Sequence, residues 1–279
     1  MSKRCHKFTQ RGDRVLLDTH FHLDFIKSPE ERQQFLSLLK ALDVGIVAQT
    51  VLPTDFFSLL EELKESNTLL SLGYHPWWIQ SDEQIELELA AFRSGLTKTR
   101  FIGEIGLDFS PKILDQASQD RQIAVLSAIF EAIIEASQPK QLPYILSLHT
   151  VRSAQAVLDL LEHYALPTYN VLPVFHRFNG TNDELFQLRR LGAYLSVNPL
   201  TLNTKKGRAY LQQMPADRLL LESDWPKQAQ ATFGQKQLLQ LADDLADLLK
   251  ETCDYMSELR GEDMTQQILH SQNALYFAN

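Results

Sequence analysis

Eight short apolar segments recur along the chain with helix-type sequence between them, and this alternation restricts the possible fold more than any other feature. Each segment is rich in Val, Ile, Leu, Phe or Tyr, as buried parallel strands are. The expected strands are 15–18, 44–49, 69–73, 101–104, 144–148, 171–175, 193–197 and 219–222. Eight strands, each followed by a helix, at roughly 35 residues per unit, describe an α/β protein of the (β/α)8 or TIM-barrel type.

Helix starts are readable between the strands. Ser28-Pro29-Glu30-Glu31 offers an N-cap, a first-turn proline and a capping-box glutamate, and the capping-box pattern recurs at 81–84 and 181–184. After residue 224 we expect an apolar-faced helix over 234–249, an acid-rich segment over 251–263 and a last helix ending near Phe277. The acidic residues of this region are expected to form a solvated helix face; they are Asp243, Asp244, Asp247, Glu251 and Asp254.

No linker or shift in composition divides the chain. The sequence therefore predicts a polar N-terminal extension over residues 1–13 and a single domain over 14–279. Two cysteines, Cys5 and Cys253, cannot build a disulfide framework, which fits a reducing compartment. The basic N-terminus lacks an apolar signal segment and no run approaches 18 apolar residues, so we expect a cytoplasmic protein without membrane contact.

The charge balance limits how the chain can meet nucleic acid. With 35 acidic and 27 basic residues the formal net charge is −8. Binding by passive neutralisation of phosphates needs a basic footprint, so that mode is excluded. A phosphate polymer remains a possible substrate only if local cations attract it.

Metal-competent side chains lie where the expected strands end. His20 and His22 follow the first strand, two residues apart, so both imidazoles can point the same way. Glu104 ends the fourth strand, His149 and His176 follow the fifth and sixth, and Asp224 follows the eighth. In a TIM barrel the functional residues lie at these C-terminal ends, so six ligands should meet at one mouth.

The ligand types indicate a divalent metal but leave the number of ions open. Imidazole and carboxylate suit Zn, Mn, Fe or Ni, and the carboxylates also admit Mg. One tetrahedral ion would use four of the six side chains. Two ions sharing a bridging carboxylate would use all six, and Glu104 is central enough among them to be that bridge.

Several local motifs occur in the order found in a known family. They are Leu17-Asp18-Thr19-His20-Phe21-His22-Leu23-Asp24, Gly73-Tyr74-His75-Pro76, Ile102-Gly103-Glu104-Ile105-Gly106-Leu107-Asp108, Leu148-His149, Phe175-His176-Arg177-Phe178-Asn179-Gly180, Leu221-Glu222-Ser223-Asp224-Trp225-Pro226 and Gln272-Asn273-Ala274-Leu275-Tyr276-Phe277. Together they resemble the TatD family of metal-dependent deoxyribonucleases in the amidohydrolase superfamily. The resemblance runs from about residue 15 to the end, and its last motif is similar to the closing helix of that family.

The resemblance implies a ligand set and an activity. It assigns His20, His22, Glu104 and Asp224 to one ion, and Glu104, His149 and His176 to a second, with Mg, Mn or Zn as the cofactors. It also implies hydrolysis of DNA phosphodiester bonds from the 3′ end. A water between two ions would be the nucleophile, with Asp224 as general base.

Substrate-binding candidates surround this set. Arg152 and Arg177 could each hold a phosphate oxygen or form ordinary salt bridges, and His75 could contact phosphate or a further cation or anchor its loop. Trp77 and Trp78 could stack on an unpaired base, or cover the core.

The sequence also departs from the family. The arginine expected two residues after His149 is replaced by Val151, and 227–235 replaces the usual loop after Pro226. The stretch from 196 to 215 resembles a TatD-like branch found in anti-phage defence systems.

Two other interpretations stay open. The same scaffold could hydrolyse an amide, ester, lactone or phosphotriester, because an activated water can attack carbon as well as phosphorus. Alternatively, the chain could be a nuclease-like subunit of a larger assembly, with the basic N-terminus and the acidic C-terminal helix as docking elements. The sequence allows either a monomer or such a subunit.

Overall fold

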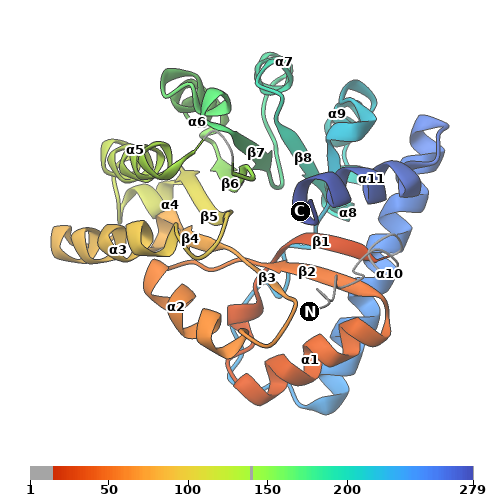
Figure 1. Ribbon diagram of the computed structural model, residues 1–279. Coiled ribbons are helices and arrows are strands. Elements are labelled where there is room, and N and C mark those ends of the chain that lie inside the picture. The colour runs from red at the N-terminus through yellow and green to blue at the C-terminus, as the bar shows by residue number, and fades with distance from the viewer. Residues whose placement is uncertain (1–14, 139–140, 279) are drawn as a thin grey trace, which may run out of the picture.

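A ring of parallel strands forms the centre of the molecule, and helices surround it (Figure 1). The computed structural model describes residues 15–138 and 141–278. The strands are β1 (Leu16–Phe21), β2 (Val44–Ala48), β3 (Leu69–Leu70), β4 (Leu72–Tyr74), β5 (Phe101–Asp108), β6 (Tyr144–Val151), β7 (Val171–Phe175), β8 (Tyr194–Val197) and β9 (Leu219–Leu221). They pair in the order β3-β2-β1-β9-β8-β7-β6-β5-β4, all parallel.

The third strand of the barrel is divided. Ser71 alone separates β3, which pairs with β2, from β4, which pairs with β5. The two halves therefore occupy one of eight barrel positions, and the predicted (β/α)8 barrel is confirmed.

The helices of the described chain follow the strands in turn. They are α1 (Pro29–Ala41), α2 (Pro53–Glu62), α3 (Asp82–Gly95), α4 (Pro111–Leu114), α5 (Gln119–Ala136), α6 (Ala154–His163), α7 (Asn182–Arg190), α8 (Pro199–Leu202), α9 (Lys205–Gln213), α10 (Gln235–Arg260) and α11 (Met264–Tyr276), with 3-10 turns η2 (Leu23–Phe25), η3 (Pro76–Trp78), η4 (Leu166–Tyr169) and η5 (Ala216–Arg218). None of the helices in residues 15–138 and 141–278 is long and apolar enough to span a membrane.

The predicted caps begin their helices, with two differences. Ser81 accepts the amide of Gln84, but the side chain of Gln84 accepts the amide of Gln80 and the hydroxyl of Tyr74 in place of the amide of Ser81. The hydroxyl of Ser28 accepts the amide of Glu31, and Thr181 forms a complete capping box with Glu184. The carboxylate of Glu31 does not turn back to Ser28; it accepts the amides of Phe233 and Gly234 instead. Because Glu31 lies on α1, these hydrogen bonds hold the N-terminal end of α10 against α1.

Three strands are longer than the sequence indicates. β1, β5 and β6 continue to Phe21, Asp108 and Val151. Consequently His20, Glu104 and His149 lie inside strands, and the expectation that they mark or follow strand ends is wrong. The polar residues suggested the ends of the apolar runs, but their side chains are buried against one another, so the ladder continues through them.

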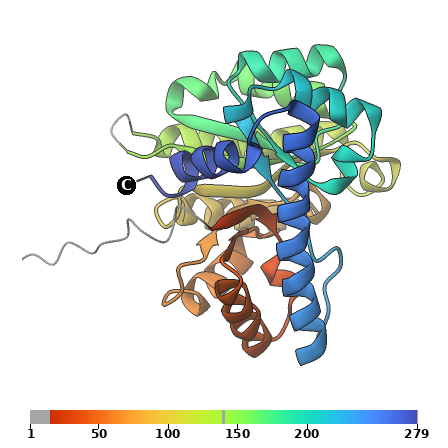
Figure 2. The same cartoon turned by 90° about the vertical axis from the view of Figure 1, so that its right-hand side faces the viewer.

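The C-terminal helices close the barrel on its outside and at one end. α10 is one continuous helix that contains residues 251–260 of the acid-rich segment, and the five acidic residues predicted to be solvated are exposed. α10 runs along the side of the barrel and α11 packs on it (Figure 2). α11 ties itself to the barrel strands, because the side chain of Gln272 accepts the amide of Leu17 at 3.0 Å. Leu275 and Tyr276 join a core cluster with buried residues of six strands.

The predicted N-terminal extension 1–13 and its cysteine, Cys5, lie outside the described residues. Cys253 is buried on α10.

Candidate metal centre

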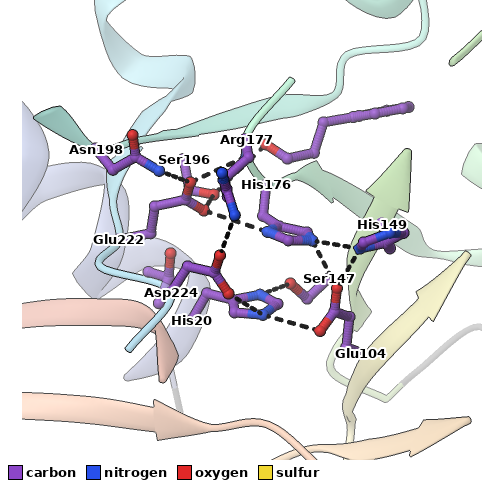
Figure 3. Close-up of polar contacts among 12 residues, drawn as sticks. His20, Glu104, Ser147, His149, His176, Arg177, Ser196, Asn198, Glu222 and Asp224 are labelled. Carbon is purple, nitrogen blue, oxygen red and sulfur yellow. Dashed lines mark hydrogen bonds and ion pairs between the residues drawn. The ribbon is translucent and has the colours of Figure 1, made fainter. Parts of the chain in front are cut away.

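All six predicted metal ligands meet at the C-terminal mouth of the barrel, and Figure 3 labels all of them except His22. His20 comes from β1, Glu104 from β5 and His149 from β6, while the other three stand on the loops after β1, β7 and β9. The structure adds His75, from the loop after β4, to the same cluster. His75 was expected at the mouth either to contact phosphate or a further cation or to anchor its loop; here its Nε2 faces Glu104 and its Nδ1 accepts the amide of Trp77.

The carboxylate of Glu104 divides the cluster into two halves. Its Oε2 lies 3.3 Å from Nε2 of His20 and 3.3 Å from Nε2 of His22. Its Oε1 lies 2.6 Å from Nδ1 of His149, 2.7 Å from Nε2 of His176 and 3.2 Å from Nε2 of His75. Each oxygen therefore faces a separate set of imidazoles.

Asp224 belongs to one half only. Its Oδ1 lies 3.5 Å from Nε2 of His22 and 3.8 Å from Nε2 of His20. Its Oδ2 accepts a hydrogen bond of 2.7 Å from Nη1 of Arg177. The residue has a left-handed backbone, with φ of 59°, and its amide donates to the carbonyl of His20, which holds the loop after β9 against β1.

A second layer of buried polar groups orients these side chains. Nδ1 of His20 lies 2.7 Å from Oγ of Ser147, and Nε2 of His149 lies 3.3 Å from Oδ2 of Asp108. Such contacts fix ring orientation in metal sites. Glu222 accepts Nδ2 of Asn198 and the amide of Arg177, and so supports the loop that follows β7 (Figure 3).

Sequence reasoning assigned no role to these supporting residues. Asp108 and Glu222 lie within the family motifs, and that position was the available signal. Ser147 lies inside an apolar strand, and the only available signal was its spacing of two residues from His149. Residues two apart on a strand point the same way, so both side chains would face into the barrel.

The electrostatics of the cluster keep a negative charge at its centre. Burial alone would raise the pKa of Glu104, but the surrounding imidazoles, His75 and His176 foremost, hold it well below its usual range. Burial lowers the pKa of His20 to about 3, with a further contribution from His176, so His20 is neutral. Neutral imidazole and ionised carboxylate are the forms that bind metals, and His20 and Glu104 already have them. Burial alone would lower the pKa of His22 and His149, but the neighbouring carboxylates raise it, that of His149 to about 9, so these two rings would release a proton on binding metal.

The arrangement fits divalent metal. Nε2 of His20 is buried and has no hydrogen-bond partner among the described residues, although it points toward both carboxylates. Bonds of about 2.0–2.2 Å to a tetrahedral ion put neighbouring ligand atoms roughly 3.3–3.6 Å apart. The distances from Oε2 of Glu104 to His20 and His22 lie at the lower end of this range. The distances of 2.6 and 2.7 Å from Oε1 to His149 and His176 are shorter and are those of direct hydrogen bonds.

The two candidate arginines have different positions. Arg177 reaches the cluster through Asp224, and its side chain is 47% exposed, so part of the guanidinium still faces solvent. Arg152 contacts none of the ligands; it lines a separate pocket beside the mouth, described below. Trp77 is 51% exposed, and its Nε1 donates to Oδ2 of Asp108 at 2.6 Å.

The loop after Pro226, which departs from the family pattern, is fixed on the first βα loop. The amide of Lys27 donates to the carbonyl of Gln230, and the amide of Gln230 donates to that of Phe25. This loop therefore lies beside the half of the cluster that contains His20, His22 and Asp224.

A TIM barrel that gathers buried His, Glu and Asp side chains at its C-terminal mouth defines the class of metal-dependent hydrolases. The model of the family TatD related DNase matches residues 17–275, which is nearly the whole chain. The chain belongs to the TatD family.

Individual relatives agree with this assignment. The chain is 26% identical over 218 residues to "Uncharacterized metal-dependent hydrolase YabD" of Bacillus subtilis, a match that covers 76% of this chain and 80% of that protein. It is 34% identical over 130 residues, 45% of each chain, to "3'-5' ssDNA/RNA exonuclease TatD" of Edwardsiella piscicida. The solved structure of YjjV, a TatD homologue of Escherichia coli, superposes with a TM-score of 0.72 at 24% identity and covers 96% of this chain and 100% of that one. That likeness shows the fold. The resemblance to the anti-phage branch stays a prediction.

Proposed function

We propose that this protein hydrolyses phosphodiester bonds of DNA as a 3′–5′ exodeoxyribonuclease that uses two divalent ions, Mg, Mn or Zn. The observation that carries this proposal is the divided carboxylate of Glu104. Its Oε2 faces His20 and His22, whereas its Oε1 faces His149 and His176. A carboxylate that offers one oxygen to each of two ligand sets is suited to bridge two ions.

The proposed ligand sets follow the two halves of the cluster. His20, His22 and Asp224 would hold one ion and His149 and His176 the other, with Glu104 shared between them. Two such ions, when bound, supply Lewis-acid polarisation of the phosphoryl group and lower the pKa of water.

The protein's own groups complete the reaction. Burial alone would raise the pKa of Asp224, but its hydrogen bond with His22 and the nearby rings of His176 and His20 lower it, so the carboxylate is ionised and able to accept a proton. Asp224 is therefore the proposed general base, and it can return the proton to the leaving alkoxide. Arg177, held on Asp224 by Nη1, is placed to contact a non-bridging phosphate oxygen with its remaining donors.

A single strand is the proposed form of the substrate. Relatives carry the name "3'-5' ssDNA/RNA exonuclease TatD". In this chain the indole of Trp77 stands half-exposed against the ring of His75, with centroids 4.9 Å apart, at the edge of the cluster. An exposed indole beside the reacting centre can stack on an unpaired base, which a duplex would not present.

Metal analysis joined to substrate assays tests the proposal. The purified protein should contain two divalent ions, cleave single-stranded DNA and lose activity with chelator. Oligonucleotides labelled at the 3′ or the 5′ end determine the polarity, because a 3′–5′ enzyme releases the 3′ label first. RNA, double-stranded plasmid and p-nitrophenyl esters are the competing substrates. If the protein cleaves the esters in a chelator-sensitive way but does not cleave DNA, the nuclease proposal is wrong and the alternative of an amide or ester hydrolase is favoured.

Affinity for DNA without metal should be weak, since the chain has a net charge of −8. Purification also tests whether the protein is a monomer or a subunit of an assembly, because stable partners would be purified together with a subunit. Stable partners without measurable hydrolysis would favour the assembly. A cytoplasmic location stays a prediction of the sequence.

A further inference from the structure

A pocket with a surplus of hydrogen-bond donors lies beside the metal centre, between the loops that follow β6 and β7. It has a volume of about 190 Å³, and its lining includes Thr150, Arg152, Ser153, Asn179 and Lys206. The first loop begins three residues after His149 and the second carries His176, so the pocket adjoins the half of the cluster that contains these two residues. Arg152 is three residues from His149, and three residues of chain span at most about 11 Å.

The first turn of α6 borders this pocket, because Ser153 and Ala154 are part of its lining. Ser153 is the N-cap residue, but its hydroxyl donates to the carbonyl of Leu107 at 2.6 Å and so does not cap the helix. Within the described chain, the amides of Ala154, Gln155 and Ala156 have no hydrogen-bond acceptor. A helix N-terminus with free amides and a positive dipole end favours an anion.

Independent evidence for a ligand comes from Thr150. The residue lines the pocket and is only 7% exposed, yet its Oγ1 has no hydrogen-bond partner among the described residues. A buried hydroxyl without a partner is costly, and native proteins rarely keep one. A bound acceptor group would satisfy it.

The charged side chains of the pocket also select an anion. Arg152 is exposed and lines the pocket, and its guanidinium makes no hydrogen bond or ion pair with the described residues. Lys206, on α9, donates to the carbonyl and to Oδ1 of Asn179, which places its ammonium on the opposite wall. One carboxylate, that of Glu184, lies in the lining, but the amide of Thr181 engages it in the capping box of α7.

We propose that this pocket binds a phosphate of the nucleic-acid strand next to the scissile one. This proposal rests on the proposed nuclease function and deepens it, because it defines the substrate as a chain with at least two phosphates. Phosphate offers only acceptors at neutral pH, which matches a site made of amides, a guanidinium, an ammonium and a hydroxyl. It also gives Arg152 a role distinct from that of Arg177, which lies at the metal cluster itself.

Short substrates that differ by one phosphate test the proposal in the metal-loaded protein. The dinucleotide dTpdT has one phosphodiester, whereas the trinucleotide dTpdTpdT has a neighbouring phosphate to occupy the pocket. We expect the ratio of kcat/KM for trinucleotide over dinucleotide to fall about tenfold in Lys206→Ala, as loss of one charge-assisted hydrogen bond implies. Lys205→Ala is the matched control, because Lys205 precedes it on α9, is exposed and does not line the pocket. An unchanged ratio in both Lys206→Ala and Arg152→Ala would overturn the proposal.

Titration of the metal-free protein with inorganic phosphate gives a readout that does not depend on activity. In chelator, calorimetry should show one phosphate site, weakened about tenfold in Lys206→Ala and unchanged in Lys205→Ala. If the wild-type protein binds phosphate in this way but cleaves neither nucleotide, the nuclease function fails while the phosphate site stands. Absence of phosphate binding in the wild-type protein would refute the site.

Thr150→Val separates a ligand role from a structural one. Valine keeps the shape and removes the unpaired hydroxyl, so the variant should unfold at the same or a higher temperature than the wild type. If the hydroxyl contacts phosphate, the same variant should bind inorganic phosphate several-fold more weakly. A variant of equal stability and equal phosphate affinity would show that Thr150 is no part of the site.

Discussion

Replacing Glu104 by Gln is the perturbation that most directly tests the proposed two-metal centre. The change keeps the shape of the side chain and removes the negative charge that the two halves of the cluster share. The oxygens of Glu104 lie within 3.3 Å of nitrogens of five histidines, two on one side and three on the other. Both ions should therefore bind more weakly.

The magnitude follows from the position of Glu104. Loss of a group that only orients a metal ligand costs about 10- to 100-fold in metal affinity. Glu104 is proposed to be a ligand of both ions, so we expect at least about 100-fold for each, or about 2.7 kcal/mol per ion. Asp224→Asn should act differently, because Asp224 faces only His20 and His22. This substitution should weaken only the ion that Asp224 is proposed to hold, leave the other ion bound, and lower the rate by about 10²- to 10⁴-fold through loss of the base.

The assay compares metal content with activity in purified, folded variants. Each protein is loaded with metal, desalted and analysed for bound ions, and its rate on single-stranded DNA is measured in parallel. Glu88→Gln is the matched control: Glu88 is also a buried carboxylate, but it accepts the amide and hydroxyl of Thr54 outside the metal cluster. Its metal content and rate should equal those of the wild type.

One result would refute the two-metal proposal. If Glu104→Gln keeps full metal occupancy and near-normal turnover, Glu104 does not bridge two ions. A single ion held by His20, His22 and Asp224 would then be the better description of the site.

Further predictions concern metal removal, substrate stacking and stability. Chelation should abolish DNA hydrolysis and lower the unfolding midpoint, since an ion present at 100 times its Kd stabilises the fold by about 2.7 kcal/mol; an unchanged midpoint on chelation would contradict tight binding. Trp77→Ala should raise KM for single-stranded DNA about 5- to 150-fold, while Trp77→Phe, which keeps a stacking ring, should raise it much less; equal effects would assign Trp77 to the support of Asp108 instead. Phe130→Ala should lower the free energy of unfolding by about 3–5 kcal/mol in urea, because this side chain is fully buried; a loss under 1 kcal/mol would contradict its place in the core. Glu31→Ala should cost about 1 kcal/mol in the same experiment, because it leaves the amides of 233–234 without their acceptor; full wild-type stability would show that water replaces it without cost.

The sequence by itself determined the fold class and the membership of the cluster. Alternation of apolar segments with capped helices was sufficient for a (β/α)8 barrel, because each strand–helix unit carries its own local signals. The placement of polar residues near the ends of those segments was sufficient to select His20, His22, Glu104, His149 and others as one group. In a barrel all strands run the same way, so residues near equivalent strand ends must meet at one mouth.

The tertiary structure decided the distances and the partners. Only pairing between strands shows that β5 and β6 continue past Glu104 and His149, because burial by neighbours, and not local polarity, decides where a ladder ends. The same holds for His75, which the divided third strand brings against Glu104. Arg152 and Arg177 read alike in the sequence, but one lines a pocket beside α6 and the other contacts the metal cluster. Periodicity reports which way a side chain faces from its own strand, whereas contacts between strands depend on register and loop geometry, which no single segment encodes.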